Sequence, residues 1–347
     1  MTVAAFTTGG MIVDNMVTWD GRLARGLVGG NAVYSAVGAG LWLDHVGVAA
    51  RIPQNYPPAA VQALAMTGLD LEGLVVEPVD VHRAEWFFHR PDGSRADHLH
   101  ASQAEADAFG MTGEQVPPDL VSRFEARLSM QADAGGDFKA FRAAHPVTVS
   151  QVPPHYWQAR GVHLGPNLPD AQIGLAREAR SRGLIVTCDP GFHAAHLGQS
   201  QLEELLALAD AFLPSEKELA LLCPGMSPDV ALVQLAQRAR AMVGVKCGAK
   251  GAFVLHKGQT SPVHVPALPA KVLDPTGAGD AFCGGFLAGL LLGDDAFHAG
   301  LRGAVSASLA IETAGPVPRA DAGHEAMQRL AHARATVPMI AQADRAT

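Results

Sequence analysis

The alternation of strand-like and helix-like segments in the second half of the chain is the sequence feature that most constrains its fold. Short apolar runs predict buried strands at 161–165, 184–190, 211–214, 243–247 and 252–256. Helical periodicity between and after them predicts helices at 170–182, 201–209, 229–242 and from about 278 to 313. Strands that alternate with helices indicate an α/β fold with a mostly parallel sheet and right-handed crossovers. Ligands in such folds bind beyond the carboxyl ends of the strands.

The first half of the chain is less regular. Segment 3–14 is typical of a strand, a glycine turn and a second strand, and 46–52 of a buried strand. We expect helices at 31–43, from about 57 to 66 and at 119–131. Two strand-like runs flank the turn signal PDGS within 81–100, which predicts a β-hairpin. A Gly/Asp-rich break follows at 134–137, and the rest of 101–160 carries no clear periodicity.

Composition excludes several classes of protein. Of 347 residues, 48% are hydrophobic and 17% are charged, which suits a sizeable core and not a disordered chain. The formal net charge of −8 disfavours partners such as nucleic acid or an anionic membrane surface. Four scattered cysteines without a CxxC pair favour reduced thiols over a disulfide framework. The start of the chain lacks the basic region of a signal peptide, so we expect a cytoplasmic protein.

The run DPTGAGD, from Asp274 to Asp280, carries the clearest chemical signal. A Gly/Ala turn opens an apolar helix there, and the free N–H groups of a helix start bind anions. The small residues Gly277, Ala278 and Gly279 would let a phosphate approach the backbone. Asp280 could accept a proton from a hydroxyl that attacks this phosphate. The alternative is that Asp280 merely caps a helix after a glycine turn.

Several segments in a fixed order resemble one family. The run DPTGAGDAFCGGF is similar to the C-terminal signature of the ribokinase-like (PfkB) carbohydrate kinases. GGMIVD at 9–14 and GGNAVYSAVGAGLWLDHVGVAARI at 29–52 resemble the family's first strand and its N-terminal signature. CDP, PSEKE and KCGAKGAFV, at 188–190, 214–218 and 246–254, occur in the family's order. The resemblance covers roughly 1–52 and 161–315.

The resemblance implies a three-layer α/β sandwich with a small β lid, and an ATP-dependent kinase that acts on a hydroxyl of a sugar or sugar-like molecule. We expect one kinase domain at 1–325, with lid segments near 10–30 and 80–100 and a C-terminal tail at 326–347. A homodimer through the lid is consistent with the family. The alternatives are an adenosine-like nucleoside kinase and a non-catalytic ligand-binding member of the same fold.

The resemblance also assigns roles to residues. Asp280 is the expected catalytic base, and Gly277, Ala278 and Gly279 are the expected anion hole. Asp14, Gly30 and Asn31 are expected to contact the acceptor, although Asp14 could cap a turn and Asn31 could cap the following helix. The expected ATP contacts are Ser215, Lys246, Gly248, Gly251 and Gly279.

The implied cofactors are ATP and Mg²⁺, with a monovalent cation as a further candidate. The family pattern N-x-x-E organises the metal, and here Ser215 replaces the Asn while Glu218 keeps the Glu. Serine has a shorter reach, which puts magnesium affinity and not the fold in question. The pairs His193/His196 and His98/His100 lack the spacing of a zinc site, so surface histidines are favoured there. Signatures of P-loop enzymes, dinucleotide oxidoreductases and α/β-hydrolases are absent from the sequence.

Overall fold

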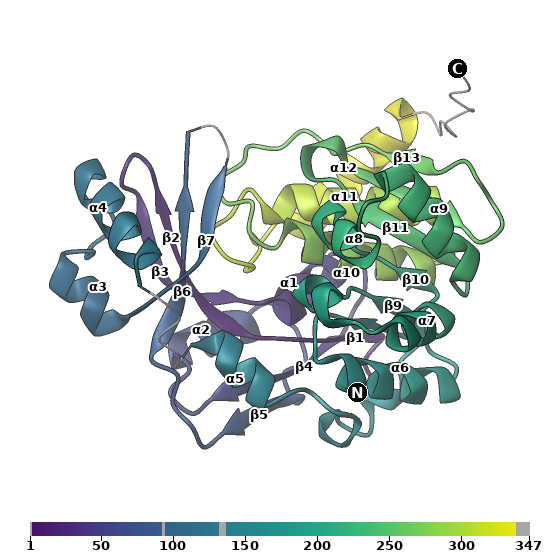
Figure 1. Cartoon of the computed structure of the whole chain (residues 1–347), viewed down its shortest axis with the longest axis horizontal. Coiled ribbons are helices and arrows are strands. Elements are labelled where there is room, and N and C mark those ends of the chain that lie inside the picture. The colour runs from purple at the N-terminus through teal and green to yellow at the C-terminus, as the bar shows by residue number, and fades with distance from the viewer. Residues whose placement is uncertain (1, 92–93, 132–136, 338–347) are drawn as a thin grey trace.

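A nine-stranded sheet forms the centre of the molecule in a computed structural model that describes residues 2–91, 94–131 and 137–337 (Figure 1). From one edge to the other, its strands are β13 (Val263–Val265), β12 (Ala252–His256), β11 (Met242–Lys246), β10 (Ala211–Phe212), β9 (Ile185–Cys188), β8 (Gly161–Leu164), β1 (Ala5–Thr8), β4 (Val46–Pro53) and β5 (Leu74–Glu77). All neighbours from β11 to β5 are parallel, whereas β12 and β13 are antiparallel additions. The mostly parallel sheet is as predicted.

Helices cover both faces of this sheet, which gives three layers. One face carries α6 (Pro169–Ser181), α7 (Gln199–Leu208), α8 (Glu216–Leu222) and α9 (Pro228–Arg238). The other face carries α1 (Asn31–Gly40), α2 (Pro58–Ala65), α10 (Ala278–Leu291), α11 (Ala296–Ala310) and α12 (Ala322–Thr336). Strand β1 pairs with β4 on one side and with β8 on the other, so the strand order reverses there. Such a switch point is where ligands of α/β sheets bind.

The prediction of one helical stretch from about 278 to 313 was wrong, because two helices occupy it. Gly293 breaks the first helix with a φ of 83°, in the left-handed region that favours glycine. The Asp295 carboxylate then accepts a hydrogen bond from the His298 amide and starts α11. The helix predicted at 229–242 was also too long, since α9 ends at Arg238 and β11 begins at Met242.

A second sheet stands apart from the first and is called the lid sheet here. Its strand order is β3 (Leu23–Gly29), β2 (Ile12–Thr18), β6 (Arg83–His89) and β7 (Arg95–Ser102). The predicted hairpin at 81–100 is present as β6 and β7 in antiparallel pairing. Asp92 and Gly93 of its PDGS turn lie outside the described residues.

The segment that sequence patterns left open, 101–160, supplies helices around the lid sheet. They are α3 (Gln103–Phe109), α4 (Pro118–Ser129) and α5 (Phe138–Ala144). Phe124 of α4 packs against Trp86 and Phe88 of β6, in a core shared with α3. One face of the lid sheet is therefore covered by helices of the same chain (Figure 1). Most of the predicted break at 134–137 lies outside the described residues, and Asp137 caps α5.

The end of the described chain belongs to the helical layer. The boundary expected at 325 falls inside α12, whose Ala326, Leu330 and Ala333 are buried in the core beside α11. None of the helices in the described ranges is long and apolar enough to cross a membrane.

Candidate active site

The start of α10 has the geometry of an anion-binding site. Gly277 precedes the helix with a φ of 74°, and a Cβ there would collide with the ring of Tyr34. Both facts require glycine at 277. Within the described residues, the backbone N–H groups of Gly279 and Asp280 have no hydrogen-bond partner. Two free donors and the positive end of a fourteen-residue helix therefore point toward the same region.

Asp280 lies at this helix start in a cluster of charges. The buried Lys246 ammonium forms an ion pair with Asp189 and lies 3.6 Å from the Cys283 sulfur. Burial first, and then the charge of Asp189, raises the pKa of Asp280 to about 7 against the opposing charge of Lys246. Burial alone lowers the pKa of Lys246, but Asp189 and then Cys283 raise it well above its usual value. Glu218 adds a third carboxylate that interacts with the same lysine.

Ser215 and Glu218 form a capping box at the start of α8. The Ser215 hydroxyl accepts a hydrogen bond from the Glu218 amide at 3.3 Å. The Glu218 carboxylate accepts one from the Ser215 amide at 2.6 Å. Burial and the charge of Asp189 raise the pKa of Glu218. The S-x-x-E pattern thus has a structural role that the sequence analysis did not predict.

The turn between β11 and β12 contains the other expected ATP contacts. Gly248 has a φ of 56° and nothing within 4 Å of its missing side chain, so the backbone there is open to a ligand. Gly251 instead approaches the Val265 carbonyl of β13 too closely for any side chain. Lys246 points away from this turn and into the charge cluster, and it lies 3.7 Å from where a Cβ on Gly279 would be. We call Lys246, Asp189, Glu218 and the start of α10 the phosphate end of the site.

Asp14 belongs to β2, a strand of the lid sheet. Its side chain is 3% exposed, and its Oδ1 is buried with no hydrogen-bond partner in the structure. Burial, and then the charges of Glu85 and Asp274, raises the pKa of Asp14 well above its usual value. A Cβ on Gly29 would overlap the Asp14 carboxylate, so the glycine makes room for it. A buried acceptor without a donor is suited to a hydroxyl group of a ligand.

Asn31 joins the two glycine turns and does not cap α1. The N-cap is Gly30, with a φ of 103° and no side-chain cap. The Asn31 Oδ1 accepts a hydrogen bond of 2.7 Å from the Gly10 amide, across 21 residues of sequence. Side chains on Gly9 or Gly30 would collide with Asn31 or with the Gly10 carbonyl. This packing places the end of β1 beside the start of α1.

Four residues near the site were not assigned by sequence patterns. Arg95 of β7 donates a hydrogen bond of 2.7 Å to the Thr276 hydroxyl, and His89 of β6 lies 3.3 Å from the Asp274 carboxylate. These contacts join the lid sheet to the loop before α10. Tyr34 is buried, with its pKa raised by burial and then by Asp14, Asp274 and Asp280. The fourth residue is Arg142.

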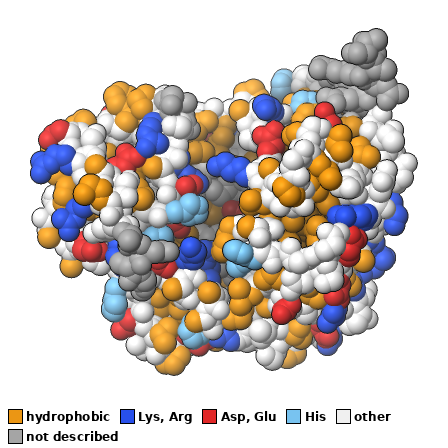
Figure 2. All heavy atoms as spheres, in the orientation of Figure 1, with side chains coloured by type: hydrophobic (Ala, Val, Ile, Leu, Met, Phe, Trp, Pro, Cys, Tyr) orange, Lys and Arg blue, Asp and Glu red, His pale blue; other side chains and the backbone are white. Residues whose placement is uncertain are grey.

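Arg142 on α5 comes from a segment that gave no sequence signal. It interacts electrostatically with Glu85 and Asp14 of the lid sheet, with Asp137 and with Asp280 at the start of α10. It lines a pocket beside Gly9–Gly10 at the ends of β1, β8 and β9, with about 340 Å³ of empty space that is partly open to solvent. Figure 2 shows this face hollowed between the lid sheet and the large sheet, with Lys, Arg and His side chains along the hollow. We call Asp14, Asn31, Arg142 and the Gly9–Gly10 turn the acceptor end.

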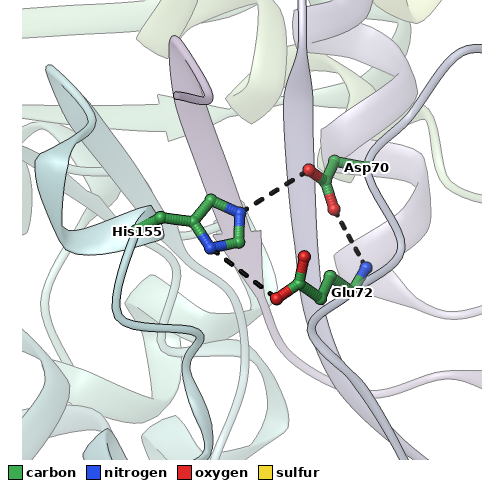
Figure 3. Close-up of side chains that lie close together, drawn as sticks. All are labelled: Asp70, Glu72 and His155. Atoms are coloured by element: carbon green, nitrogen blue, oxygen red, sulfur yellow. Dashed lines mark hydrogen bonds and ion pairs between the residues drawn. The ribbon is translucent and has the colours of Figure 1, made fainter. Parts of the chain in front are cut away.

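A group of metal-binding residue types lies outside this hollow. Asp70, Glu72 and His155 could offer ligand atoms within 4.8 Å of one another, the one such group found in the described ranges (Figure 3). The two nitrogens of His155 lie 3.7 Å from Asp70 and 3.8 Å from Glu72. Asp70 also accepts hydrogen bonds from the Tyr156 hydroxyl and the Glu72 amide. Ion pairs and hydrogen bonds thus account for the cluster. Within the described residues, neither His193/His196 nor His98/His100 belongs to such a group.

Comparison with known proteins agrees with the geometry. Residues 156–322 match the model of the pfkB family of carbohydrate kinases. A cytidine kinase of Thermococcus kodakarensis is 25% identical over 284 residues, which are 81% of this chain and 86% of that protein. An ATP-dependent ribose-1-phosphate kinase of Halopiger xanaduensis is 36% identical over 165 residues, but these are only 46% of this chain and 52% of that protein.

The solved structures extend the likeness to nearly the whole chain. The nucleoside kinase of Burkholderia thailandensis in complex with inosine covers 96% of this chain and all of its own, with a TM-score of 0.68. At 21% identity this match shows the fold alone. The family model, the kinase relatives and the fold agree: residues 156–322 match the pfkB carbohydrate kinases, the whole chain has the fold of ribokinase-family structures, and the chain is a kinase.

Proposed function

We propose that this kinase transfers the γ-phosphate of ATP to a hydroxyl of a sugar or nucleoside, with Asp280 as general base. One observation carries the assignment: free N–H donors and a half-buried carboxylate with a pKa of about 7 meet at the start of α10. A base with such a pKa is suited to take a proton near neutral pH. The donors beside it suit the charge that develops on a transferring phosphoryl group.

Each group of the phosphate end has a part in this proposal. The acceptor hydroxyl donates its proton to the Asp280 carboxylate. The N–H groups of Gly279 and Asp280, with Gly277 and Ala278 as the turn that exposes them, bind the oxygens of the phosphoryl group. Lys246, held by its ion pair with Asp189, supplies a positive charge close to Gly279 at the start of α10. The catalytic work is positioning and charge stabilisation.

The phosphate end also fits Mg²⁺. The carboxylates of Asp189, Glu218 and Asp280 interact with one lysine, so two negative charges are left over when all three are ionised. Oxygen donors of this kind suit a hard cation. Glu218 would hold the metal, directly or through water, and Ser215 fixes the position of Glu218 through the capping box. When bound, Mg²⁺ neutralises part of the charge of the ATP phosphates.

The nucleotide and the acceptor would enter from opposite sides. The open backbone at Gly248 favours ATP at the turn between β11 and β12, with Gly251 holding that turn against β13. Asp14 would accept hydrogen bonds from acceptor hydroxyls, and Asn31 with Gly30 would hold the glycine turns beside them. The contacts Arg95–Thr276 and His89–Asp274 would close the lid sheet over the acceptor and keep water out. Relatives named nucleoside kinase and ribose-1-phosphate kinase support both acceptor classes.

Asp280→Asn tests the proposal. We expect the full chain to convert MgATP and a sugar or nucleoside into ADP and a phosphate ester, detected by phosphorus NMR. The variant should keep its affinity for an ATP analogue and lose roughly a hundredfold or more in kcat, the usual contribution of a general base. Asp321→Asn, a change to an exposed acid far along the chain, is the control and should leave kcat unchanged. Near-normal turnover in Asp280→Asn would reject the assignment of the base.

A further inference from the structure

We propose that the acceptor is an anionic sugar, a sugar phosphate or a sugar acid, and that Arg142 binds its oxyanion group. The inference rests on the proposed function and concerns the substrate class of the same site. It starts from Arg142, a cation in the acceptor end whose side chain has no hydrogen bond or ion pair to any described residue.

Arg142 differs from the other arginine in its pocket. Arg51 forms an ion pair with Glu77, which also lies 3.4 Å from His145. Arg142 forms no hydrogen bond or ion pair with any described residue, and its Nε is fully buried. Burying a guanidinium whose N–H donors are unpaired costs free energy, and burial lowers the pKa of Arg142 although Glu85 and other nearby carboxylates oppose this shift. An anion that enters the pocket would remove this cost.

The carboxylates around Arg142 are directed to other groups. Glu85 accepts a hydrogen bond from the His98 amide and lies 3.4 Å from the His98 ring. Asp137 caps α5 through the Ala140 amide and lies 3.8 Å from His100. Asp14 and Asp280 act on Arg142 only through longer-range charge. The protein therefore surrounds the guanidinium with compensating charge but leaves its donors to a ligand.

The position of Arg142 suits an oxyanion on the acceptor. Its Nη1 lies 2.9 Å from where a Cβ on Gly10 would be, so the glycine turn leaves the guanidinium accessible. On its other side, its Cζ lies 5.2 Å from the centre of the Phe192 ring, which is 40% exposed. The guanidinium is a planar fork that can donate two parallel hydrogen bonds to a phosphate or a carboxylate.

The other residues that line the pocket also suit an anionic ligand. Its titratable residues are all basic, and they are Arg51, Arg142, His145 and His193. Burial, and then the charge of Arg142, lowers the pKa of His193 to about 4, so its ring is neutral at pH 7 and can donate one hydrogen bond. A nucleobase is less suited, because Arg142 already covers one face of Phe192, the aromatic ring in this lining.

Matched acceptor pairs test the inference. The full chain with a non-hydrolysable ATP analogue is titrated calorimetrically with ribose 5-phosphate, fructose 6-phosphate and gluconate, and with ribose, fructose, glucose and inosine. We expect at least one anionic compound to bind ten times more tightly than its neutral parent. Arg142→Gln should weaken that compound at least tenfold and leave the ATP analogue unchanged, while Arg142→Lys should lie between. Comparing the two sugar phosphates with gluconate shows whether the site binds a phosphate or a carboxylate.

Controls keep the outcome decisive. Arg90→Gln, which removes an exposed lid arginine paired with Glu125, should change nothing. If Arg142→Gln does not fold, competition by sulfate against the anionic compound on the unmodified protein replaces it, and no competition rejects the inference. Efficient phosphorylation of neutral sugars or nucleosides, with no effect of Arg142→Gln, would reject the anionic acceptor and leave the kinase proposal intact. Failure to bind the ATP analogue and to phosphorylate any acceptor would instead reject the proposed function.

Discussion

The phosphate end and the acceptor end of the hollow handle buried charge in opposite ways. At the phosphate end, Lys246 is paired with Asp189, and the free donors belong to the backbone of α10. At the acceptor end, the Asp14 Oδ1 and the Nε of Arg142 are buried without hydrogen-bond partners among the described residues. At the phosphate end the unpaired donors belong to the backbone, whereas at the acceptor end side chains stay unpaired until a ligand binds.

This difference separates chemistry from specificity. A phosphoryl group is the same for every acceptor, so backbone donors and a fixed lysine can serve it without adjustment. Acceptors differ in hydroxyls and charges, and unpaired side chains discriminate between them because a wrong ligand leaves them unpaired. We therefore expect substitutions at the phosphate end to affect stability and rate, and those at the acceptor end to affect which compound binds.

The largest expected effect is on folding stability at the phosphate end. Lys246→Met would leave the Asp189 carboxylate buried without its partner. Removing one member of a buried ion pair costs about 3–5 kcal/mol, so the free energy of unfolding should fall by that amount. The measurement is urea unfolding followed by circular dichroism at pH 7.

The double variant Lys246→Met with Asp189→Asn is the matched control for this prediction. It removes both charges, so it should recover much of the loss, as contacting residues do in double-mutant cycles. If Lys246→Met costs less than about 1 kcal/mol, the typical value for an exposed pair, the phosphate end does not depend on this ion pair.

A smaller effect is expected on acceptor binding at the other end. Asp14→Asn keeps the volume of the side chain but replaces one of the two acceptor oxygens with a donor. The affinity for the acceptor should fall by roughly 1–3 kcal/mol, the range for a stranded hydrogen-bond partner. Separate calorimetric titrations of acceptor and ATP analogue measure it, with Asp20→Asn, in the turn between β2 and β3, as a control. If Asp14→Asn instead lost affinity for the ATP analogue and kept its affinity for the acceptor, the assignment of the two ligands to the two ends would be the wrong way round.

The smallest expected effect concerns magnesium. Glu218→Gln keeps the capping box, because Gln can replace Glu at that position. It should raise the Mg²⁺ concentration for half-maximal rate by about tenfold, as loss of a supporting ligand does. Ser215→Ala separates the two roles, since it removes a cap worth about 1 kcal/mol and keeps the carboxylate. An unchanged magnesium dependence in Glu218→Gln would leave Glu218 with the capping role alone.

The two ends also differ in how far the sequence predicts them. The turn before α10 is local, so DPTGAGD is sufficient to predict a helix start with small residues and a carboxylate. The alternation of strands and helices likewise predicts the parallel sheet. The break at Gly293 was missed because apolar residues continue on both sides of it.

The acceptor end depends on contacts between distant segments. Asn31 was expected as a possible helix cap, and only the packing of two glycine turns directs it to Gly10. Arg142 stands on a seven-residue helix beyond a Gly/Asp-rich stretch, without periodicity or a turn signal nearby. One arginine among many carries no mark of burial in the sequence, so its role emerges only when α5 is placed beside β1.

The pH dependence of kcat/KM for the acceptor tests the central claim most directly, because this parameter reports ionisations of the free enzyme. Asp280 must be ionised to accept a proton, and its pKa is raised to about 7. Activity should therefore fall below pH 7, by about tenfold for each pH unit, and level off above it. The residual activity of Asp280→Asn should lack this acid limb. A profile that is flat between pH 5 and 8, or an acid limb that persists in Asp280→Asn, would contradict the assignment of Asp280 as the base at the start of α10.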